Sequence, residues 1–327
     1  MNVQIWLVLS LEFYFLCMIQ CTKVLFGTKV QIKEIDTDTG NVKILVGDAR
    51  GEMYGMDYDP KYKYMYFTRY NHRTIMRFPY PSDNQVLEKF IDTGKGPAGL
   101  AIDSESGHVY WTEYDWHRLR RCDVNGINTV IISSNLQNPF SIRLSLVNRW
   151  MYVVERFKRI IKARFNYSEA HGIIDLNTQV DYMDLDKKEE KLYWTTYYHG
   201  DFKSASVRGC DVKTIFQTGI TNYYQPIDVY GSSIFFSNNK KLFLMNTTLG
   251  TTSTALYTDA YRIFSIYVYH QAGNTRVYVL YVLVMFMTCN SGVTHWRIDR
   301  RAKKIDKVRI RKLHARRSRS NRKPCVP

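Results

Sequence analysis

A short apolar and aromatic segment, repeated along the chain, restricts the possible folds more strongly than any other part of the sequence. It is clearest at Val109-Tyr110-Trp111-Thr112, and related quartets occupy 65–68, 151–154, 192–195 and 234–237. The second positions of the quartets are 66, 110, 152, 193 and 235. The intervals between successive positions, 44, 42, 41 and 42 residues, match the repeat length of roughly 40–45 residues that is typical of a propeller blade with four strands.

One complete copy of the repeat, Gly99 to Gly126 with the residues just after it, predicts a four-stranded antiparallel meander. Two apolar runs, 100–102 and 109–111, are separated by the turn-forming segment 104–107. A third strand is expected over 119–124, and Asn125-Gly126 favours a tight turn into a fourth strand at 129–132. An apolar residue marks the fourth strand of each copy, at Leu87, Ile131, Ile174, Ile215 and Leu256.

The two ends of the repeat array complement each other. The segments 24–26, 30–35 and 42–46 predict a second, third and fourth strand without a first. The segment 263–268 follows the last full copy and can supply the missing inner strand. Because a propeller hides its edge strands by closing into a ring, we predict an all-β, six-bladed β-propeller closed by the pairing of its N- and C-terminal strands.

These residues resemble the YWTD repeat of the low-density-lipoprotein receptor family. The resemblance rests on Tyr110-Trp111-Thr112-Glu113, on Gly99 to Asp103 before it and on Asp123 to Gly126 after it, and it covers about residues 22–272. The family's inner-strand aspartate is matched at Asp59, Asp103, Asp186 and Asp228, and Ser145 breaks the pattern. The acid after the quartet is kept only as Glu113 and Glu155, and the other copies carry Arg69, Thr196 and Asn238.

The resemblance implies a non-enzymatic extracellular module that binds a protein ligand, as in receptors for endocytic uptake or Wnt co-reception. One alternative is a secreted propeller that serves matrix assembly. Another is a six-bladed hydrolase with a metal over the central channel, which would need several acidic or histidine side chains at the channel mouth. The expected starts of the inner strands do not supply them, and no HExxH, GxSxG or phosphate-binding glycine loop occurs. We therefore expect no catalytic residue, metal or cofactor.

The candidate ligand-binding face is formed by the hairpin loops that follow the quartets. These loops combine large aromatic residues with charged neighbours, which is the composition of binding hot spots. The candidates are Tyr70, His72, Tyr114, Asp115, Trp116, His117, Arg156, Phe157, Lys158, Tyr197, Tyr198 and His199. The alternative is that individual aromatic residues pack between blades. The three histidines share a loop register and would gain charge in an acidifying endosome, which would repel a basic partner.

Two sequons, at Asn166 and Asn246, fall near expected turns between third and fourth strands. Strand alternation places those turns on the face opposite the candidate ligand-binding face. If both sites carry sugar, the candidate face stays free.

The apolar pattern of residues 1–21 is typical of a secretory signal peptide, and the alternative is a buried first strand. Its removal would leave Cys122, Cys210, Cys289 and Cys325, which show no disulfide-framework or metal-ligand spacing. Cys122 and Cys210 belong to blades that are not neighbours, so we do not expect them to pair with each other. The protein is expected to be extracellular or at the cell surface.

Positive charge is concentrated at the C-terminal end of the sequence. Fourteen Lys and Arg against two Asp in 297–327 contribute +12 of the net charge of +16. The propeller itself is only mildly basic, so no nucleic-acid ligand is expected. The preceding segment 273–296 contains an apolar run, and three interpretations of the C-terminal region remain: a short membrane anchor over 277–293, a disordered basic extension, or an aberrant gene end. We expect the propeller to be monomeric.

Overall fold

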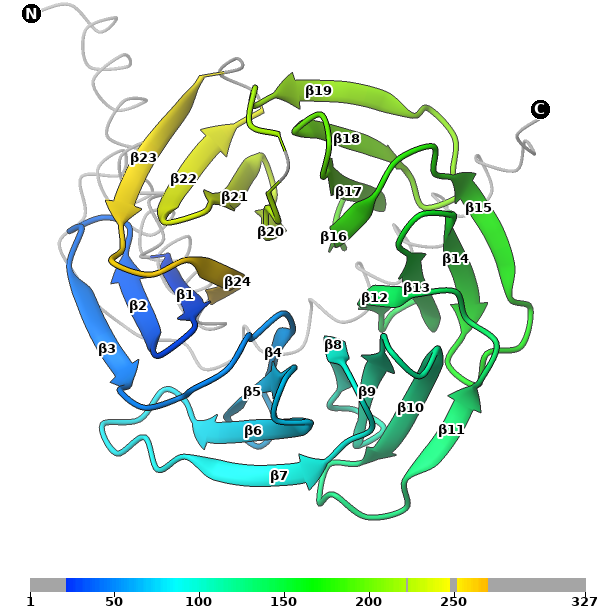
Figure 1. Cartoon of the computed structure of the whole chain (residues 1–327), viewed down its shortest axis with the longest axis horizontal. Helices are drawn as coiled ribbons and strands as arrows, with labels where there is room; N and C mark the ends of the chain where they lie inside the picture. Colours follow the sequence, from blue (N-terminus) through cyan, green and yellow to red (C-terminus); the bar gives the residue numbers. More distant parts are fainter. Residues whose placement is uncertain (1–21, 222, 248–251, 270–327) are drawn as a thin grey trace, which may run out of the picture. The chain divides into compact units, whose positions relative to one another are not determined.

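The computed structural model describes residues 22–221, 223–247 and 252–269, which form six four-stranded antiparallel sheets arranged in a ring (Figure 1). The predicted six-bladed propeller is therefore confirmed. The expected signal peptide at 1–21, the apolar segment 273–296 and the basic tail 297–327 lie outside the described residues, as do Cys289 and Cys325. The described part of the chain contains no helix long and apolar enough to cross a membrane.

The strands follow one another from the centre of each blade to its rim. Blade 1 contains β4 (Met56–Asp59), β5 (Tyr64–Arg69), β6 (Thr74–Pro79) and β7 (Glu88–Asp92), and blade 2 contains β8 (Pro97–Asp103), β9 (His108–Glu113), β10 (Arg118–Asp123) and β11 (Val130–Ser133). Blade 3 contains β12 (Pro139–Ser145), β13 (Trp150–Glu155), β14 (Arg159–Arg164) and β15 (His171–Asp175), and blade 4 contains β16 (Val180–Asp186), β17 (Lys191–Thr196), β18 (Asp201–Ser206) and β19 (Lys213–Gln217). Blade 5 contains β20 (Ile227–Tyr230), β21 (Ser233–Asn238), β22 (Lys241–Asn246) and β23 (Ser253–Thr258).

Blade 6 is formed by both ends of the repeat array. Its inner strand is β24 (Ile263–Tyr269), followed outward by β1 (Lys23–Thr28), β2 (Ile32–Asp36) and β3 (Val42–Val46). Antiparallel pairing joins β24 to β1, with Lys23 opposite Tyr269 and Phe26 opposite Ile266. The ring is thus closed as the sequence predicts. The five quartets all lie in second strands, and four of the five fourth-strand markers lie in the outer strands; Leu87 comes just before β7.

The expected equivalence of the inner-strand aspartates is wrong for Asp228. Asp59, Asp103 and Asp186 each end their inner strand, opposite the first residue of the second strand. Asp228 instead lies opposite Phe235 in the middle of the blade 5 hairpin, because that hairpin turns earlier, after Tyr230. Spacing along the chain does not reveal this difference, because the shorter turn changes the pairing register without changing the distance to the quartet.

The threonine of the quartet joins neighbouring blades. In blade 2, the Thr112 hydroxyl accepts a hydrogen bond from the Gly99 N–H at 2.8 Å and donates to the carbonyl of Phe140, in blade 3, at 2.6 Å. Thr68 makes the same pair of bonds with Gly55 and with the carbonyl of Ala98 in blade 2. The inner strands approach so closely that a Cβ on Gly99 would lie 2.2 Å from the Phe140 carbonyl oxygen. The repeat therefore encodes contacts between blades as well as within them.

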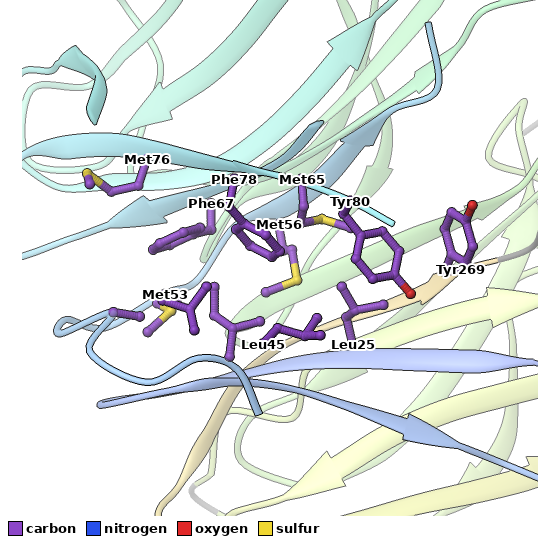
Figure 2. Packing of buried hydrophobic residues seen from close by; sticks show 13 residues of the cluster. Leu25, Leu45, Met53, Met56, Met65, Phe67, Met76, Phe78, Tyr80 and Tyr269 are labelled. Atoms are coloured by element: carbon purple, nitrogen blue, oxygen red, sulfur yellow. The ribbon is translucent and has the colours of Figure 1, made fainter. Parts of the chain in front are cut away.

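The core consists of apolar seams between adjacent blades. Figure 2 shows the seam between blades 6 and 1, where Leu25 and Leu45 meet Met65, Phe67 and Phe78. All five of these side chains are buried. Ring closure therefore buries a continuous apolar cluster, which is the main source of stability in such a fold.

Candidate functional site

The four loops that carry the predicted site lie at one end of the ring. They connect β5 to β6, β9 to β10, β13 to β14 and β17 to β18. Because strands alternate in direction, these loops share a face with the connections that lead from each outer strand to the next inner strand (Figure 1). We call this surface the loop face.

The predicted residues differ in how far they reach solvent. Trp116, Phe157 and Tyr198 are exposed at 42%, 51% and 46% of their surface. Tyr70, Tyr114 and Tyr197 are half-buried, and Arg156 is buried; the charged or polar candidates at the loop tips, His72, Asp115, His117, Lys158 and His199, are exposed. Trp116, Phe157 and Tyr198 thus protrude from the loop face, as a binding surface requires. Tyr70, Tyr114 and Tyr197 are packed more deeply beneath them, and we call these three residues the aromatic floor.

Arg156 lies inside the loop face rather than on it. Its guanidinium forms an ion pair with Asp181 and donates a hydrogen bond to the Tyr114 hydroxyl at 3.3 Å. The guanidinium also lies 5.0 Å from the ring centre of Phe140 and 5.2 Å from that of Tyr224. Burial alone would lower the pKa of Arg156, but the charge and hydrogen bonds of Asp181 outweigh it and raise the pKa. Arg156 is thus a buried cation that contacts the half-buried Tyr114 together with Phe140 and Tyr224.

The channel mouth at the loop face is filled by aromatic rings, which we call the aromatic plug: Tyr54, Phe140, Tyr182, Tyr224 and Phe264. Tyr54 contacts Phe140, Phe264 and Tyr224 at ring-centre distances of 5.1, 5.6 and 5.7 Å. The Tyr182 hydroxyl donates to the Phe264 carbonyl at 2.5 Å. Within the described residues, no group of three or more His, Cys, Asp or Glu is placed to hold a metal ion. Sequence reasoning missed the plug, although an aromatic residue near the start of four inner strands was a visible signal.

The exposed Trp116 is held in place by the connection from blade 1 and by its own blade. Its indole lies against Gly94, in the connection from blade 1 to blade 2, where a Cβ would come within 2.1 Å of the ring, and the Arg118 guanidinium lies 5.0 Å from the ring centre. Nearby, the Tyr70 hydroxyl donates to the Asp115 carboxylate at 3.0 Å and so links blades 1 and 2. These contacts fix the orientation of a large aromatic surface before any ligand arrives.

The three histidines of the loop face belong to three blades. His117 Nδ1 accepts a hydrogen bond from the Asn138 N–H at 3.2 Å, which ties its loop to blade 3. No hydrogen bond or ring contact joins His72, His117 and His199 to one another in the described part of the propeller. They share a face, and each would have to act separately on a ligand.

The two sequons lie on the opposite face, as strand alternation predicts. Asn166 is exposed in the loop between β14 and β15, where its side-chain oxygen accepts hydrogen bonds from the N–H and hydroxyl of Ser168. Asn246 ends β22 on the same side of the ring.

Cys122 is a free thiol buried in the seam between blades 1 and 2, so it is not bonded to Cys210. Burial, followed by the charge of Asp123, raises the pKa of Cys122 to about 12. The thiol therefore behaves as an inert core residue.

A cavity of about 430 Å³ occupies the central channel below the plug, and its charged lining includes Asp57, Arg143, Asp184 and Asp228. Each of the three carboxylates accepts a backbone N–H from the next inner strand, at 2.6 to 2.8 Å. Arg143 pairs with Asp184 at 2.6 Å. This polar layer therefore joins the blades around the axis.

The two neighbouring carboxylates of this layer differ in protonation. Burial and then the charge of Asp184 raise the pKa of Asp228 well above its ordinary value. Burial also opposes ionisation of Asp184, but the charge of Arg143 and several hydrogen bonds outweigh it and lower the pKa of Asp184. Asp184 is thus the ionised partner, and Asp228 tends to keep its proton.

Comparison with known proteins agrees with the repeats and the fold. Low-density lipoprotein receptor-related protein 5 of Mus musculus is 28% identical to this chain over 136 residues, and the protein of that name from Homo sapiens is 26% identical over 136 residues. Each match covers 38% of this chain and 8% of the relative. This chain contains a propeller of the low-density-lipoprotein receptor-related type. The resemblance inferred from the YWTD-like repeats is confirmed, although no family model matches the chain.

A solved structure of the same architecture is described as "Crystal structure of Nidogen/Laminin Complex". Its similarity has a TM-score of 0.66 at 15% sequence identity and covers 76% of this chain and 98% of the solved chain. At that identity the likeness establishes the fold alone. Because this chain spans only 8% of the length of the receptor-related proteins it matches, their activities as whole proteins do not transfer directly.

Proposed function

We propose that this protein is an exported, non-enzymatic module that binds an extracellular protein through its loop face. The observation that carries the proposal is the exposure of Trp116, Phe157 and Tyr198 on one rigid surface. Large aromatic side chains on a pre-organised surface provide contact area at a low cost in conformational entropy. The ligand class we favour is a protein taken up or sensed at the cell surface, through endocytic uptake or Wnt co-reception.

The structure behind the loop face supports this proposal. The buried Arg156–Asp181 pair and the aromatic plug support the exposed rings from below, so little ordering is needed on binding. A hydrolase would place acidic or histidine side chains at the channel mouth, and aromatic rings occupy that position here. Sugar at Asn166 and Asn246 would extend from the opposite face and leave the loop face accessible. The propeller is expected to act as a monomer.

The relatives are compatible with the proposal. The names of the two similar proteins describe them as receptor-related, and the solved structure is of a nidogen/laminin complex. A receptor role accounts for export and for a rigid binding surface together. A matrix-assembly role would differ by leaving the protein in the insoluble extracellular fraction instead of on cells.

The test is capture of extracellular proteins from conditioned medium by the full chain, followed by identification of the captured protein. Trp116→Ala combined with Phe157→Ala should reduce capture at least tenfold, because both side chains are exposed anchors. Val147→Ala is the matched control, since Val147 is 91% exposed in the hairpin between β12 and β13 on the opposite face. Equal capture by the double variant and the control would remove the loop face from the proposal.

A further inference from the structure

The residue after the quartet has a defined structural role in blade 2. Glu113 is fully buried there, and its Oε1 accepts hydrogen bonds from the Gly94 N–H at 2.7 Å and from the Trp111 indole N–H at 3.1 Å. The Arg120 guanidinium lies 3.2 Å from the same oxygen. A carboxylate at this position therefore satisfies a backbone donor, an indole and a cation together.

Blade 4 keeps these donors but lacks the carboxylate. Trp194 lies opposite Lys203 in the same strand register in which Trp111 lies opposite Arg120. Thr196 replaces the glutamate, and its hydroxyl turns away to accept the Asp201 N–H at 2.9 Å. Among the described residues, the indole N–H of Trp194 makes no hydrogen bond, and Lys203 reaches only the Thr214 hydroxyl at 3.1 Å and the Asp201 carboxylate at 4.0 Å.

A cavity of about 340 Å³ lies where the missing side chain would be. It is lined by Trp194, Thr196 and Lys203 from blade 4 and by Leu176, Asn177 and Thr178 from the connection out of blade 3. The Thr178 hydroxyl oxygen is buried without a hydrogen-bond partner in the described part of the chain. The cavity is large enough for several water molecules or for one small organic acid.

The backbone donor also has a counterpart in the connection into blade 4. The Tyr114 N–H donates to the Gly96 carbonyl, and the Tyr197 N–H donates to the Gln179 carbonyl. Gly96 and Gln179 are therefore equivalent positions in the connections that lead into blades 2 and 4. Two positions earlier stand Gly94, in the connection from blade 1 to blade 2, and Asn177, in the connection from blade 3 to blade 4. By this alignment Asn177 is the counterpart of Gly94, whose N–H donates to Glu113 in blade 2.

We propose that this cavity binds the carboxylate of an external ligand, in the place that Glu113 occupies in blade 2. The carboxylate would accept hydrogen bonds from Trp194 and Asn177 and pair with Lys203, while a short aliphatic portion packs against Leu176. Two other carboxylates face this region: Asp201 shares Lys203, and the exposed Asp175 lines the rim. They weaken the attraction, so the affinity for a short monocarboxylate is expected to be roughly millimolar.

The experiment follows the indole N–H resonance of Trp194 in the full chain labelled with ¹⁵N-tryptophan and assigned with Trp194→Phe. Propionate should shift this resonance saturably, whereas propionamide and sodium chloride at equal ionic strength should not. A second probe, N-acetylglutamate N-methylamide, distinguishes a free acid from an acidic side chain. Saturation by propionate alone supports a free-acid site, and saturation by both supports a site that also accepts a side chain.

Two variants test the assigned contacts. Thr196→Glu fills the cavity with the chain's own carboxylate and should abolish the propionate-dependent shift. Lys203→Met removes the cation with little loss of volume and should weaken binding at least tenfold, while Lys213→Met in the neighbouring strand should not. If Thr196→Glu fails to fold, the two lysine variants still decide the question. A non-saturable shift, an equal shift with propionamide, or full binding by Lys203→Met would overturn the proposal.

Discussion

Asp228→Asn offers a sharp test of the polar layer inside the channel. The Asp228 carboxyl accepts the Val268 N–H at 2.6 Å and lies beside Asp184, whose charge helps to raise the pKa of Asp228. An amide has the same shape as a protonated carboxyl, can accept the same N–H and can donate to Asp184. The substitution therefore keeps the hydrogen bonds and removes the titrating proton.

The sign of the effect follows from proton linkage. In the unfolded chain Asp228 ionises near its ordinary pKa of about 4, whereas folding holds the proton to higher pH. Wild-type stability therefore falls as pH rises from about 4 through the raised pKa. Each pKa unit by which folding raises the pKa of Asp228 corresponds to about 1.4 kcal/mol, and Asp228→Asn should recover that free energy at pH 7. For a domain of this size, each 1.4 kcal/mol recovered raises the melting temperature by about 3–5 °C.

The matched variant Asp184→Asn should act in the opposite direction. Asp184 is the ionised partner of Arg143, whose side chain retains 22% of its exposure within the channel. Removing one member of a buried pair typically costs about 3–5 kcal/mol. Here Asp228 can ionise in its place, so we expect a loss on the order of 2 kcal/mol.

The assay is urea-induced unfolding of both variants and the wild type between pH 4 and pH 8. The advantage of Asp228→Asn should grow with pH and disappear near pH 4. A destabilised Asp228→Asn, or a gain that does not change with pH, would refute the assignment of the proton to Asp228. Equal behaviour of the two variants would refute the asymmetry between the carboxylates.

Three further predictions address closure, the exposed tryptophan and the histidines. Deletion of 260–270 removes the inner strand β24 of blade 6 and should replace a single calorimetric transition with a broad one at lower temperature, because the ring then has open strand edges; an unchanged transition would contradict closure by β24. Trp116→Ala should change unfolding free energy by less than about 0.5 kcal/mol and weaken ligand capture, since the side chain is 42% exposed; a large loss of stability would assign it to the core. The triple variant His72, His117, His199→Gln should lose acid-promoted ligand dissociation between pH 7.4 and 5.5, because histidine ordinarily titrates near pH 6.5; unchanged acid sensitivity would exclude these three residues from release.

Much of the fold was predictable because it depends on spacing along the chain. The regularly spaced quartets predict the second strands, and the complementary ends predict closure through β24 and β1. The loop that carries each candidate residue also follows from strand order. Prediction was less successful where a turn changed length, as at Asp228, whose register depends on the early turn after Tyr230.

Strand and turn patterns repeated along one chain were enough to specify the architecture, the closing strand and the end of the ring on which the candidate residues lie. Three features emerge only in the assembled ring: Arg156 is buried against Asp181, five aromatic residues close the channel mouth, and Thr196 leaves a cavity beside Trp194. Each of these depends on contacts across the ring or between neighbouring blades. The partners are distant in sequence and meet only when the ring is complete, so burial, pairing and empty space are properties of the assembled blades.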